Sequence, residues 1–450
     1  MILSNSEENP VLSGATADFL SGGDEQIPDL VNCFGSPLHI VFPEQAAENA
    51  AYWKREVSKA YQNTKVLYAF KACKSISLAQ SFASEGAGAD VSSVEEFVSA
   101  MRCGFAGSEI SVTGPDKPSD LLDLAIIHRA AIHIDSETEL GRVVKLQAKY
   151  GRKTGLFIRL LPPLQCGSRF GLDRQAALRC FGVLKANGYA DFGLAFHLSG
   201  YSLSDRVDVL KYAVEVAREA ADIGIMARAI DIGGGFPVQY LTSHSVTTYS
   251  KGSHLSEHAQ IDTYPYAADL ASYSQAHDIV ENAMHHPACR DFIERHKVEI
   301  RLQPGRSLLD QCGITLMRVI SVKPKIGGGT YAVLEGMSFS ISERWFGSDF
   351  APVPLLIPVS KAARPATDDC YLVGQSCLES DVIRNKAVCW NQSPLSGDIV
   401  CFANTAGYQM DSNESSFHQK LLPEKVAILR QTSGWKYYRD SNCNIRVRSV

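Results

Sequence analysis

The sequence predicts an α/β protein in two parts, a (β/α)8 barrel of the TIM type followed by a C-terminal all-β domain. Short apolar runs alternate with amphipathic helical stretches from about residue 36 to about residue 310. Strands that alternate with helices indicate a parallel sheet, and a long series of such units indicates a closed barrel. After about residue 311 the apolar runs are β-rich and separated by turn signals, which is typical of an all-β domain.

The predicted barrel covers residues 45–310. A strand at 66–70 precedes a helical stretch that starts at Leu78. Further barrel strands are expected at 89–91, 132–134, 156–159, 194–197, 229–232 and 298–302. A polar, histidine-rich stretch at about 241–300 is interpreted as an insertion, and the sequence assigns it no fold.

The predicted β domain covers residues 311–450. Its expected strands lie at 314–320, 331–334, 370–373 and 398–402. Residues 28–44, which include the apolar run 36–41, are expected to add a strand to this domain. Residues 1–27 are rich in Ser, Gly, Asp and Glu, which predicts a flexible N-terminal arm.

Composition and charge exclude several classes of function. The chain has 450 residues, 45% of them hydrophobic and 21% charged, so it can bury a large core. A net charge of −5 provides no basic surface for nucleic acid. We expect no signal peptide and no membrane helix, because the start lacks a basic region and the apolar runs are short. The 12 cysteines include no CxxC pair, which favours reduced thiols in the cytoplasm over disulfides or a zinc site.

One lysine follows an apolar strand directly, in the sequence YAFKAC at 68–73. In a barrel, catalytic groups lie at the C-terminal ends of the strands. Lys71 at such an end can form a Schiff base with an aldehyde cofactor. The alternative is a lysine that is simply exposed to solvent at the end of a strand.

A glycine-rich loop follows the strand at 229–232, in the sequence DIGGGFP at 231–237. Three consecutive glycines expose backbone N–H groups that suit a phosphate at the mouth of a barrel, although a tight turn also uses glycine. The next strand ends in QPGR at 303–306, which supplies a loop with one cation. Each of these motifs taken separately is only suggestive.

The motifs together occur in an order that resembles the ornithine/diaminopimelate decarboxylase family. The series is YAFKAC, DVSSVEE, FIRL, SRFGL, FHLSG, DIGGGFP, QPGR, CLESD and GDIVCFANTAGY, within about residues 34–420. The resemblance implies a pyridoxal-phosphate enzyme of fold type III with an alanine-racemase-like barrel. It also implies an amino-acid decarboxylase that forms a homodimer with active sites at the interface. In such enzymes the cofactor accepts electrons as carbon dioxide leaves.

The resemblance assigns roles to individual residues of the barrel. Lys71 matches the lysine that binds the cofactor covalently, and His197 matches a histidine that stacks on its ring. For His197 the alternative is a core histidine, and for Tyr408 it is ordinary aromatic packing. The implied cofactor-binding residues are Lys71, Asp90, Arg159, His197, Ser199, Gly233, Gly234, Gly235, Gln303, Gly305, Arg306 and Tyr408, with Glu96 as a further acidic match.

A second group of matching residues lies in the β domain. Cys377 and Asp381 fit a CxxxD element that the partner subunit contributes in this family. A thiol there is a candidate acid that returns a proton to the substrate, and a buried structural cysteine is the alternative. The implied catalytic residues are Lys71, Cys377 and His197, and the implied substrate-binding residues are Arg306, Cys377, Leu378, Asp381 and Tyr408.

The chain departs from the family pattern at two cofactor positions, so we interpret it as a divergent member. Gln303 stands where the family has an acid that keeps the ring nitrogen protonated, and without that charge the electron withdrawal weakens. In the loop after His197, serine and glycine stand in the reverse order from the family pattern. Either Ser199 or Ser202 then supplies a hydroxyl to the phosphate, or this contact is lost.

The third departure concerns the substrate. Leu378 directly follows the cysteine, where family members that form diamines have an acid to pair with the distal amine. An unpaired buried ammonium would cost roughly 3–5 kcal/mol. We therefore expect an amino acid or amino-acid conjugate other than ornithine, lysine or diaminopimelate, in siderophore or other secondary metabolism. The sequence names neither the substrate nor its stereochemistry.

Three alternatives remain beside the decarboxylase. Gln303 leaves open a racemase or another α-carbon reaction on the same scaffold, and a catalytically silent member that binds a partner protein is possible. Retention of the lysine, histidine, cysteine and tyrosine of the site argues against the silent form. The third alternative is a metal site in the histidine-rich stretch. We expect no metal there, because loop histidines usually face solvent. Its residues are His254, His258, His277, His285, His286, Cys289 and His296.

Overall fold

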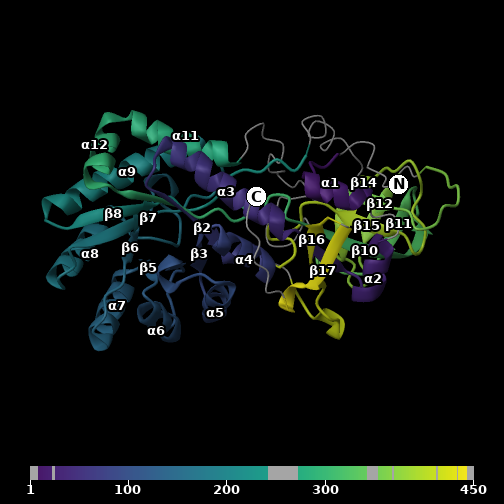
Figure 1. Ribbon diagram of the computed structural model, residues 1–450, viewed down its shortest axis with the longest axis horizontal. Helices are drawn as coiled ribbons and strands as arrows, with labels where there is room; N and C mark the ends of the chain where they lie inside the picture. The colour runs from purple at the N-terminus through teal and green to yellow at the C-terminus, as the bar shows by residue number, and fades with distance from the viewer. Residues whose placement is uncertain are drawn as a thin grey trace.

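The protein consists of a barrel and a mixed β-sheet domain that lie side by side (Figure 1). The computed structural model describes residues 9–22, 26–241, 272–341, 353–366, 369–411, 414–432 and 434–442. Among the helices of these residues, none combines the length and apolar character needed to cross a membrane. The predicted fold class, a TIM-like barrel with a separate β domain, is confirmed.

Eight parallel strands close the barrel. Each pairs with the next, and the first pairs with the last through the register Thr64↔Ile300. The short apolar runs form strands because parallel barrel strands are covered on both faces. The strands are β2 (Thr64–Ala69), β3 (Gly88–Val91), β4 (Ile110–Val112), β5 (Ala131–Ile134), β6 (Leu156–Arg159), β7 (Asp191–Ala195), β8 (Met226–Asp231) and β9 (Glu299–Leu302).

Helices alternate with these strands and cover the outside of the barrel (Figure 1). Several start at a side chain that accepts a hydrogen bond from a free backbone N–H of the first turn, as Ser93 and Ser136 do. The helices are α3 (Pro43–Ala60), α4 (Ile76–Ser84), α5 (Val94–Cys103), α6 (Ser119–His128), α7 (Glu137–Tyr150), α8 (Arg174–Ala186), α9 (Leu203–Asp222), α11 (Ser272–His285) and α12 (Pro287–His296).

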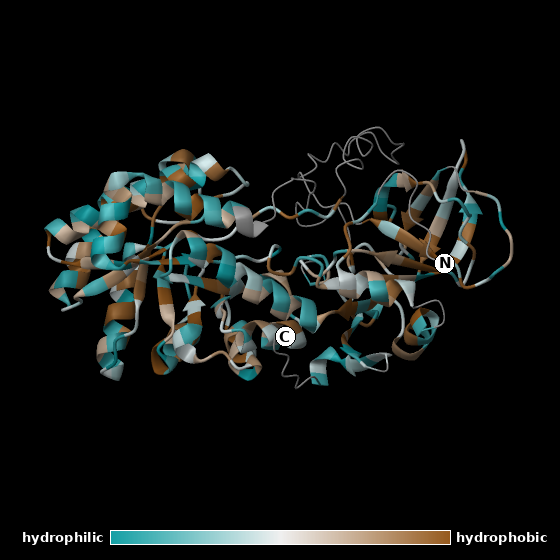
Figure 2. Ribbon diagram, turned by 45° about the horizontal axis from the view of Figure 1, so that its top comes forward, coloured by the Kyte–Doolittle hydropathy of each residue, from teal (hydrophilic) through white to brown (hydrophobic). Residues whose placement is uncertain are grey.

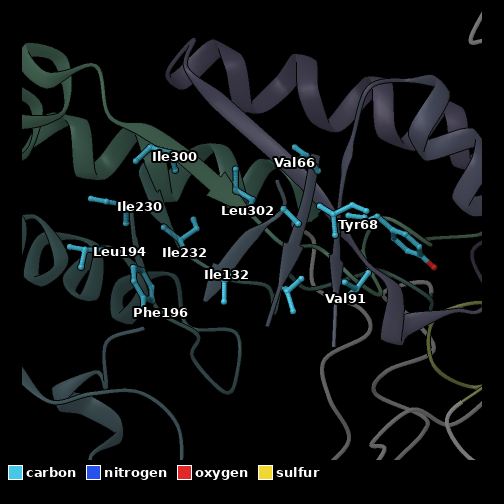
Figure 3. Close-up of a cluster of buried hydrophobic side chains, with 14 of the residues drawn as sticks. Val66, Tyr68, Val91, Ile132, Leu194, Phe196, Ile230, Ile232, Ile300 and Leu302 are labelled. Carbon is cyan, nitrogen blue, oxygen red and sulfur yellow. The ribbon is translucent and has the colours of Figure 1, made fainter. Parts of the chain in front are cut away.

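The barrel core is built from the apolar residues of the strands. Figure 3 shows side chains of β2, β3, β5, β7, β8 and β9 and of the segments after them, which belong to the layer between the strands and the covering helices, since the same cluster includes Leu78 and Phe82 of α4. A separate cluster on alternate strand positions faces the inside of the barrel and consists of Ala131, Phe157, Ala195 and Ala229. Figure 2 shows the corresponding pattern along the chain, with apolar residues on the strands and polar residues on the outer helix faces. A packed interior leaves the strand ends as the place for a functional cavity.

The second domain contains a nine-stranded mixed sheet in the order β14-β13-β11-β10-β1-β16-β17, with β12 and β15 attached off this path. The long strand β10 pairs antiparallel with β1, β11 and β15. The strands are β1 (Leu38–Val41), β10 (Gly313–Pro324), β11 (Thr330–Leu334), β12 (Pro354–Ile357), β13 (Cys370–Val373), β14 (Val382–Val388), β15 (Ile399–Phe402), β16 (Glu424–Gln431) and β17 (Gly434–Arg439).

Two sequence-based predictions need correction. Part of the expected flexible arm is helical, since α1 (Gly14–Ser21) and the start of α2 (Gln26–Phe34) pack on the sheet and bury Phe19. The expected insertion at 241–300 is too long, because α11, α12 and β9 are regular parts of the barrel. Residues 242–271, with His254 and His258, lie outside the described residues. His277 lies with Asp278 and Glu281 on α11 in a partly exposed group of possible metal ligands.

The β domain holds the chain segment that follows β2. The carboxylate of Asp440 accepts hydrogen bonds from the backbone of Ile76 and Ser77 and from the hydroxyl of Ser75. On the other side, the backbone N–H of Tyr408 donates to the carbonyl of Ala72 at 2.7 Å. Contacts from two parts of the β domain therefore fix the backbone around Lys71.

Candidate active site

A cavity of about 360 Å³ opens at the C-terminal ends of the barrel strands. Every one of the eight strands supplies a lining residue at or just after its end. These are Lys71, Asp90, Thr113, His133, Arg159, Ala195, Asp231 and Gln303, joined by Ser92, Gly114, Pro115, Gln165, Ser168, Phe170, Phe196, His197 and Ser199. The volume suits a small organic ligand.

Lys71 lies directly after β2, in a short 3-10 turn (Phe70–Ala72) that ends the strand. Asp90 at the end of β3 is its buried acidic neighbour, and burial raises the pKa of Asp90 to about 7 although the charge of Lys71 opposes this. Glu96 accepts a hydrogen bond from the backbone N–H of Ser92 at 2.7 Å. Burial also raises the pKa of Glu96. The amine of Lys71 thus lies in a region with two carboxyl groups.

His197 faces the glycine-rich loop after β8. Its Nδ1 accepts a hydrogen bond from the backbone N–H of Gly234 at 3.2 Å. Burial lowers the pKa of His197 to about 3, and the charges of Lys71 and Arg159 act in the same direction. The imidazole is therefore neutral, with Nδ1 as acceptor and the proton on Nε2.

The loop needs its glycines because the chain approaches its neighbours closely. Gly233 has φ +71, and a Cβ there would lie 2.6 Å from Nδ1 of His197. A Cβ on Gly234 would overlap the carbonyl oxygen of Gln303, and one on Gly235 would overlap the guanidinium of Arg206. Arg206 is buried and donates to the carbonyls of Gly200 and Gly234. The loop is held in one conformation with its backbone close to the cavity.

Asp231 and Gln303 form a hydrogen-bonded pair inside the cavity. Nε2 of Gln303 donates to Oδ2 of Asp231 at 2.8 Å, and the backbone N–H of Gly233 donates to Oδ1 at 2.9 Å. Burial raises the pKa of Asp231 to about 6, against these hydrogen bonds and the charge of Arg301. Since an ionised carboxylate only accepts, the amide oxygen of Gln303 is left as a neutral acceptor.

Arg159 and Ser199 complete one wall. Nη1 of Arg159 lies 3.2 Å from Oδ1 of Asp135, and its guanidinium stacks 4.4 Å from the ring centre of Phe170. The backbone of Ser199 exchanges two hydrogen bonds with the side chain of Gln165. The SRFG loop at 168–171 therefore borders the cavity through Ser168 and Phe170.

Gly305, Arg306 and Tyr408 form a second group beside the cavity. A Cβ on Gly305 would lie 2.8 Å from the hydroxyl oxygen of Tyr408 and 3.2 Å from the Cβ of Ala72. Nη1 of Arg306 donates to the carbonyl of Gly407 at 3.0 Å, and its guanidinium lies 5.1 Å from the Tyr408 ring centre. Tyr408 has φ +73, an uncommon conformation for a residue with a side chain.

The predicted β-domain residues lie in the loop between β13 and β14. Cys377 and Leu378 are exposed, so the alternative of a buried structural cysteine does not apply. Asp381 is buried, and its carboxylate accepts from the backbone N–H groups of Ser338 at 2.6 Å and Ser376 at 2.9 Å. Asp381 therefore organises the loop. None of these three residues lines the barrel cavity of its own chain.

Sequence reasoning missed several residues of this site, among them His133, Asp231 and, behind the glycine loop, Arg206. His133 and Asp231 stand at or near strand ends, so the rule that singled out Lys71 could have found them. His133 is buried and stacks on Phe157 with ring centres 4.7 Å apart, and burial lowers its pKa well below the usual value. Arg206 carries no sequence signal, since an arginine on an amphipathic helix resembles a solvated residue.

The fold and this site define a class of protein, a barrel with a lysine amine and a glycine-rich loop at the mouth of its cavity. The family model of pyridoxal-dependent decarboxylases, pyridoxal binding domain, matches residues 47–309. The chain belongs to this family, is a carboxy-lyase of the pyridoxal-phosphate type, and has pyridoxal phosphate as its cofactor.

Individual relatives agree with this assignment. The uncharacterised protein y4yA of Sinorhizobium fredii is 36% identical, with 94% of each chain covered. Diaminopimelate decarboxylase of Archaeoglobus fulgidus is 23% identical over 80% of each chain. L-glutamyl-[BtrI acyl-carrier protein] decarboxylase of Niallia circulans is 22% identical over 86% of this chain and 88% of that one. The crystal structure of Helicobacter pylori diaminopimelate decarboxylase with L-lysine superimposes with a TM-score of 0.72 at 18% identity, over 92% and 96% of the two chains.

The residues present fit the cofactor. An aldehyde needs a primary amine, which Lys71 supplies at the cavity wall, and a phosphate needs backbone donors, which the glycine loop packed against His197 can offer without intervening side chains. Buried polar atoms without a hydrogen-bond partner, Oδ1 of Asp90 and Nε2 of His133, also belong to residues that line the cavity. Such atoms are accounted for when a polar ligand binds beside them.

Proposed function

We propose that this enzyme removes the α-carboxylate of an amino acid, or of an amino-acid conjugate, that carries no free distal amine. The observation that carries this proposal is Leu378, exposed directly after Cys377 on the β13–β14 loop. Leucine offers no charge to a distal ammonium, which would lose its hydration without gaining a partner. A relative named for a glutamyl carrier-protein conjugate supports a substrate whose distal end is blocked.

Each residue of the site has a proposed task. Lys71 binds the cofactor covalently and releases the product amine, and the neutral ring of His197 packs on the cofactor ring. Gly235 binds the phosphate through its backbone, with Arg306 and Tyr408 on the other side, while the N–H groups of Gly233 and Gly234 hold the loop against Asp231 and His197. When bound, the cofactor accepts the electron pair that decarboxylation leaves on Cα.

Cys377 returns a proton to Cα in the proposed reaction. Because Cys377 does not line the cavity of its own chain, we propose a homodimer in which this loop completes the partner subunit's site. Asp381 then acts by holding the loop in shape, since its carboxylate is used by backbone donors.

A second reaction type has one observation in its favour. The pairing of Gln303 with Asp231 gives the cavity a neutral acceptor where the resemblance leads us to expect a carboxylate. A ring nitrogen without an ionic partner withdraws electrons less strongly, which suits a racemase better than a decarboxylase. Cys377 and Asp381, which match the CxxxD element of the decarboxylases, favour decarboxylation.

The test is a panel of substrates incubated with the purified enzyme and read by mass spectrometry for loss of carbon dioxide. The panel contains ornithine, lysine, meso-diaminopimelate, glutamate, and glutamyl and other aminoacyl amides and thioesters. We expect turnover of compounds without a free distal amine, with Lys71→Ala as the inactive control. Efficient turnover of ornithine, lysine or diaminopimelate contradicts the substrate proposal, and inversion at Cα without carbon dioxide release contradicts the decarboxylase.

A further inference from the structure

Cys377 has a titratable partner from another loop of the β domain. Its Sγ lies 3.2 Å from Nε2 of His418, and its backbone N–H donates to the same nitrogen at 3.4 Å. His418 stands in the short 3-10 turn between β15 and β16, 41 residues further along the chain. A thiol and an imidazole at this separation share one proton.

The backbone on both sides holds this pair in place. On the cysteine side, the buried carboxylate of Asp381 accepts hydrogen bonds that fix the loop. On the histidine side, His418 has φ +58, and its ring lies 4.2 Å from the ring centre of Phe417. A left-handed conformation is costly for histidine, so the turn persists because packing fixes it, as is common at functional sites.

We infer that Cys377 and His418 act as one acid–base pair, in which His418 restores the proton that Cys377 gives away. This inference rests on the proposed decarboxylation and deepens it. The S–H bond of Cys377 breaks as its proton bonds to Cα, which leaves a thiolate. Nε2 of His418, which is exposed, then accepts a proton from water and passes it to that sulfur. One proton is taken from solvent for each carbon dioxide released, so the cycle balances.

Among the described residues, the thiol of Cys377 is the polar group next to the His418 ring. Within the described part of the chain, the side chains in contact with the His418 ring are Phe417 and Cys377, and no carboxylate pairs with it. Glu379 and Lys420 are the nearest charged residues along the two loops, and neither contacts the pair in the described structure. The ring therefore has no other ionic partner there to compete for its proton.

The test measures how fast iodoacetamide alkylates each cysteine of the holoenzyme without substrate, by peptide mass spectrometry between pH 5.5 and 9. Cys33 and Cys166 are also exposed and serve as internal references. An imidazole partner increases thiolate character. We expect Cys377 to react about tenfold faster than the references near pH 6.5, because the imidazole accepts the thiol proton. His418→Gln should make Cys377 behave like the references, and the exposed His128→Gln control should change nothing.

A second readout is the kinetics with a substrate from the panel. His418→Gln should lower kcat by about tenfold to a hundredfold and leave KM nearly unchanged, because proton delivery follows substrate binding. If His418→Gln folds poorly, His418→Asn takes its place, provided that its Tm equals that of the wild type. Cys377 reactivity equal to the references, or unaltered by both His418 substitutions, overturns the inference. If the reactivity behaves as expected and no substrate is decarboxylated, the pair stands and the proposed function fails.

Discussion

The barrel mouth and the β13–β14 loop use their polar residues in opposite ways. At the mouth, Asp90, His133 and Asp231 are buried, and burial shifts each pKa away from its usual value. On the loop, Cys377 and Leu378 are exposed, and the buried Asp381 is satisfied by backbone groups. Burial of ionisable groups at the mouth costs free energy, which a bound ligand can recover by pairing with them. Substitution of the exposed side chains on the loop should change the stability of the fold little. We therefore propose that cofactor binding depends on the buried groups of the mouth, and substrate choice on the exposed positions of the loop.

The largest effect should come from the exposed loop. Cys377→Ala removes the proposed proton donor and should lower the rate of normal product formation by about 10²–10⁴-fold, with the cofactor still bound. Cys166→Ala, another exposed thiol, is the matched control and should leave the rate unchanged. Product analysis and the absorbance of the bound cofactor provide the readout. Unchanged turnover would remove Cys377 from the reaction.

The next largest effect should come from the barrel mouth, where burial makes ionisation of Asp90 unfavourable. Asp90 has a pKa of about 7 in the folded protein, well above the value near 4 of an unfolded chain. The folded state then binds this proton more tightly, so the contribution of Asp90 to stability is greatest below about pH 4 and falls by roughly 4 kcal/mol as the pH rises to 7. In cofactor-free protein, Asp90→Asn should remove this fall.

Urea denaturation of the cofactor-free protein at pH 5 and pH 8 measures the difference. Asp90→Asn should gain about 2–4 kcal/mol over the wild type at pH 8, and less at pH 5. The exposed Asp191→Asn at the start of β7 should show the wild-type pH dependence. An equal pH dependence in wild type and Asp90→Asn would mean that the carboxyl group is not held in this environment.

A smaller effect should follow from adding one methyl group to the anion loop. Gly233→Ala introduces a Cβ 2.6 Å from Nδ1 of His197 at φ +71, so it combines backbone strain with a displaced ring. We expect cofactor affinity to fall by roughly tenfold to a hundredfold, since αL strain alone costs about 1–2 kcal/mol. Gly200→Ala has a similar φ of +79 with no atom within 4 Å, so it reports the strain without the contact. Equal losses in the two variants would exclude a role for the His197 contact.

The smallest expected effect returns to the loop and concerns specificity. Leu378→Asp places an acid directly after Cys377, and kcat/KM for ornithine or lysine should rise by about tenfold, or 1.4 kcal/mol. Leu395→Asp, at a similarly exposed position of the β domain, is the control and should change nothing. If Leu378→Asp gains no activity on diamino acids, residue 378 does not face the substrate.

Most of the barrel strands could be predicted from the sequence, whereas few of the side-chain contacts in the site could. The strands that carry Lys71, Asp90 and Arg159 were found because barrel strands are short apolar runs ended by polar residues. The three-residue strand β4 was missed, as was β12, which pairs with β15 far along the chain. Strands β14, β16 and β17 were also missed, although β14 pairs with the preceding strand β13 and β16 forms a hairpin with β17. Helix α1 was taken for part of a flexible arm, because its few apolar residues are buried only by the sheet.

The parts of the site that escaped prediction depend on tertiary contacts. The pairing of Gln303 with Asp231 joins the ends of two barrel strands 72 residues apart. His418 comes to Cys377 only because two loops of the β domain meet, and no motif in the sequence marks it. Individual residue types at strand ends could be read from the chain, whereas the partners that set their charge could not.

The attachment of the cofactor to Lys71 is the claim on which the account depends, and borohydride reduction tests it directly. Reduction of the holoenzyme followed by peptide mass spectrometry should find a pyridoxyl group on Lys71. Lys74→Ala, which alters the exposed lysine three positions further on, should retain the label, and Lys71→Ala should lose it. A label on another lysine of the wild-type enzyme, or no label at all, would contradict the account.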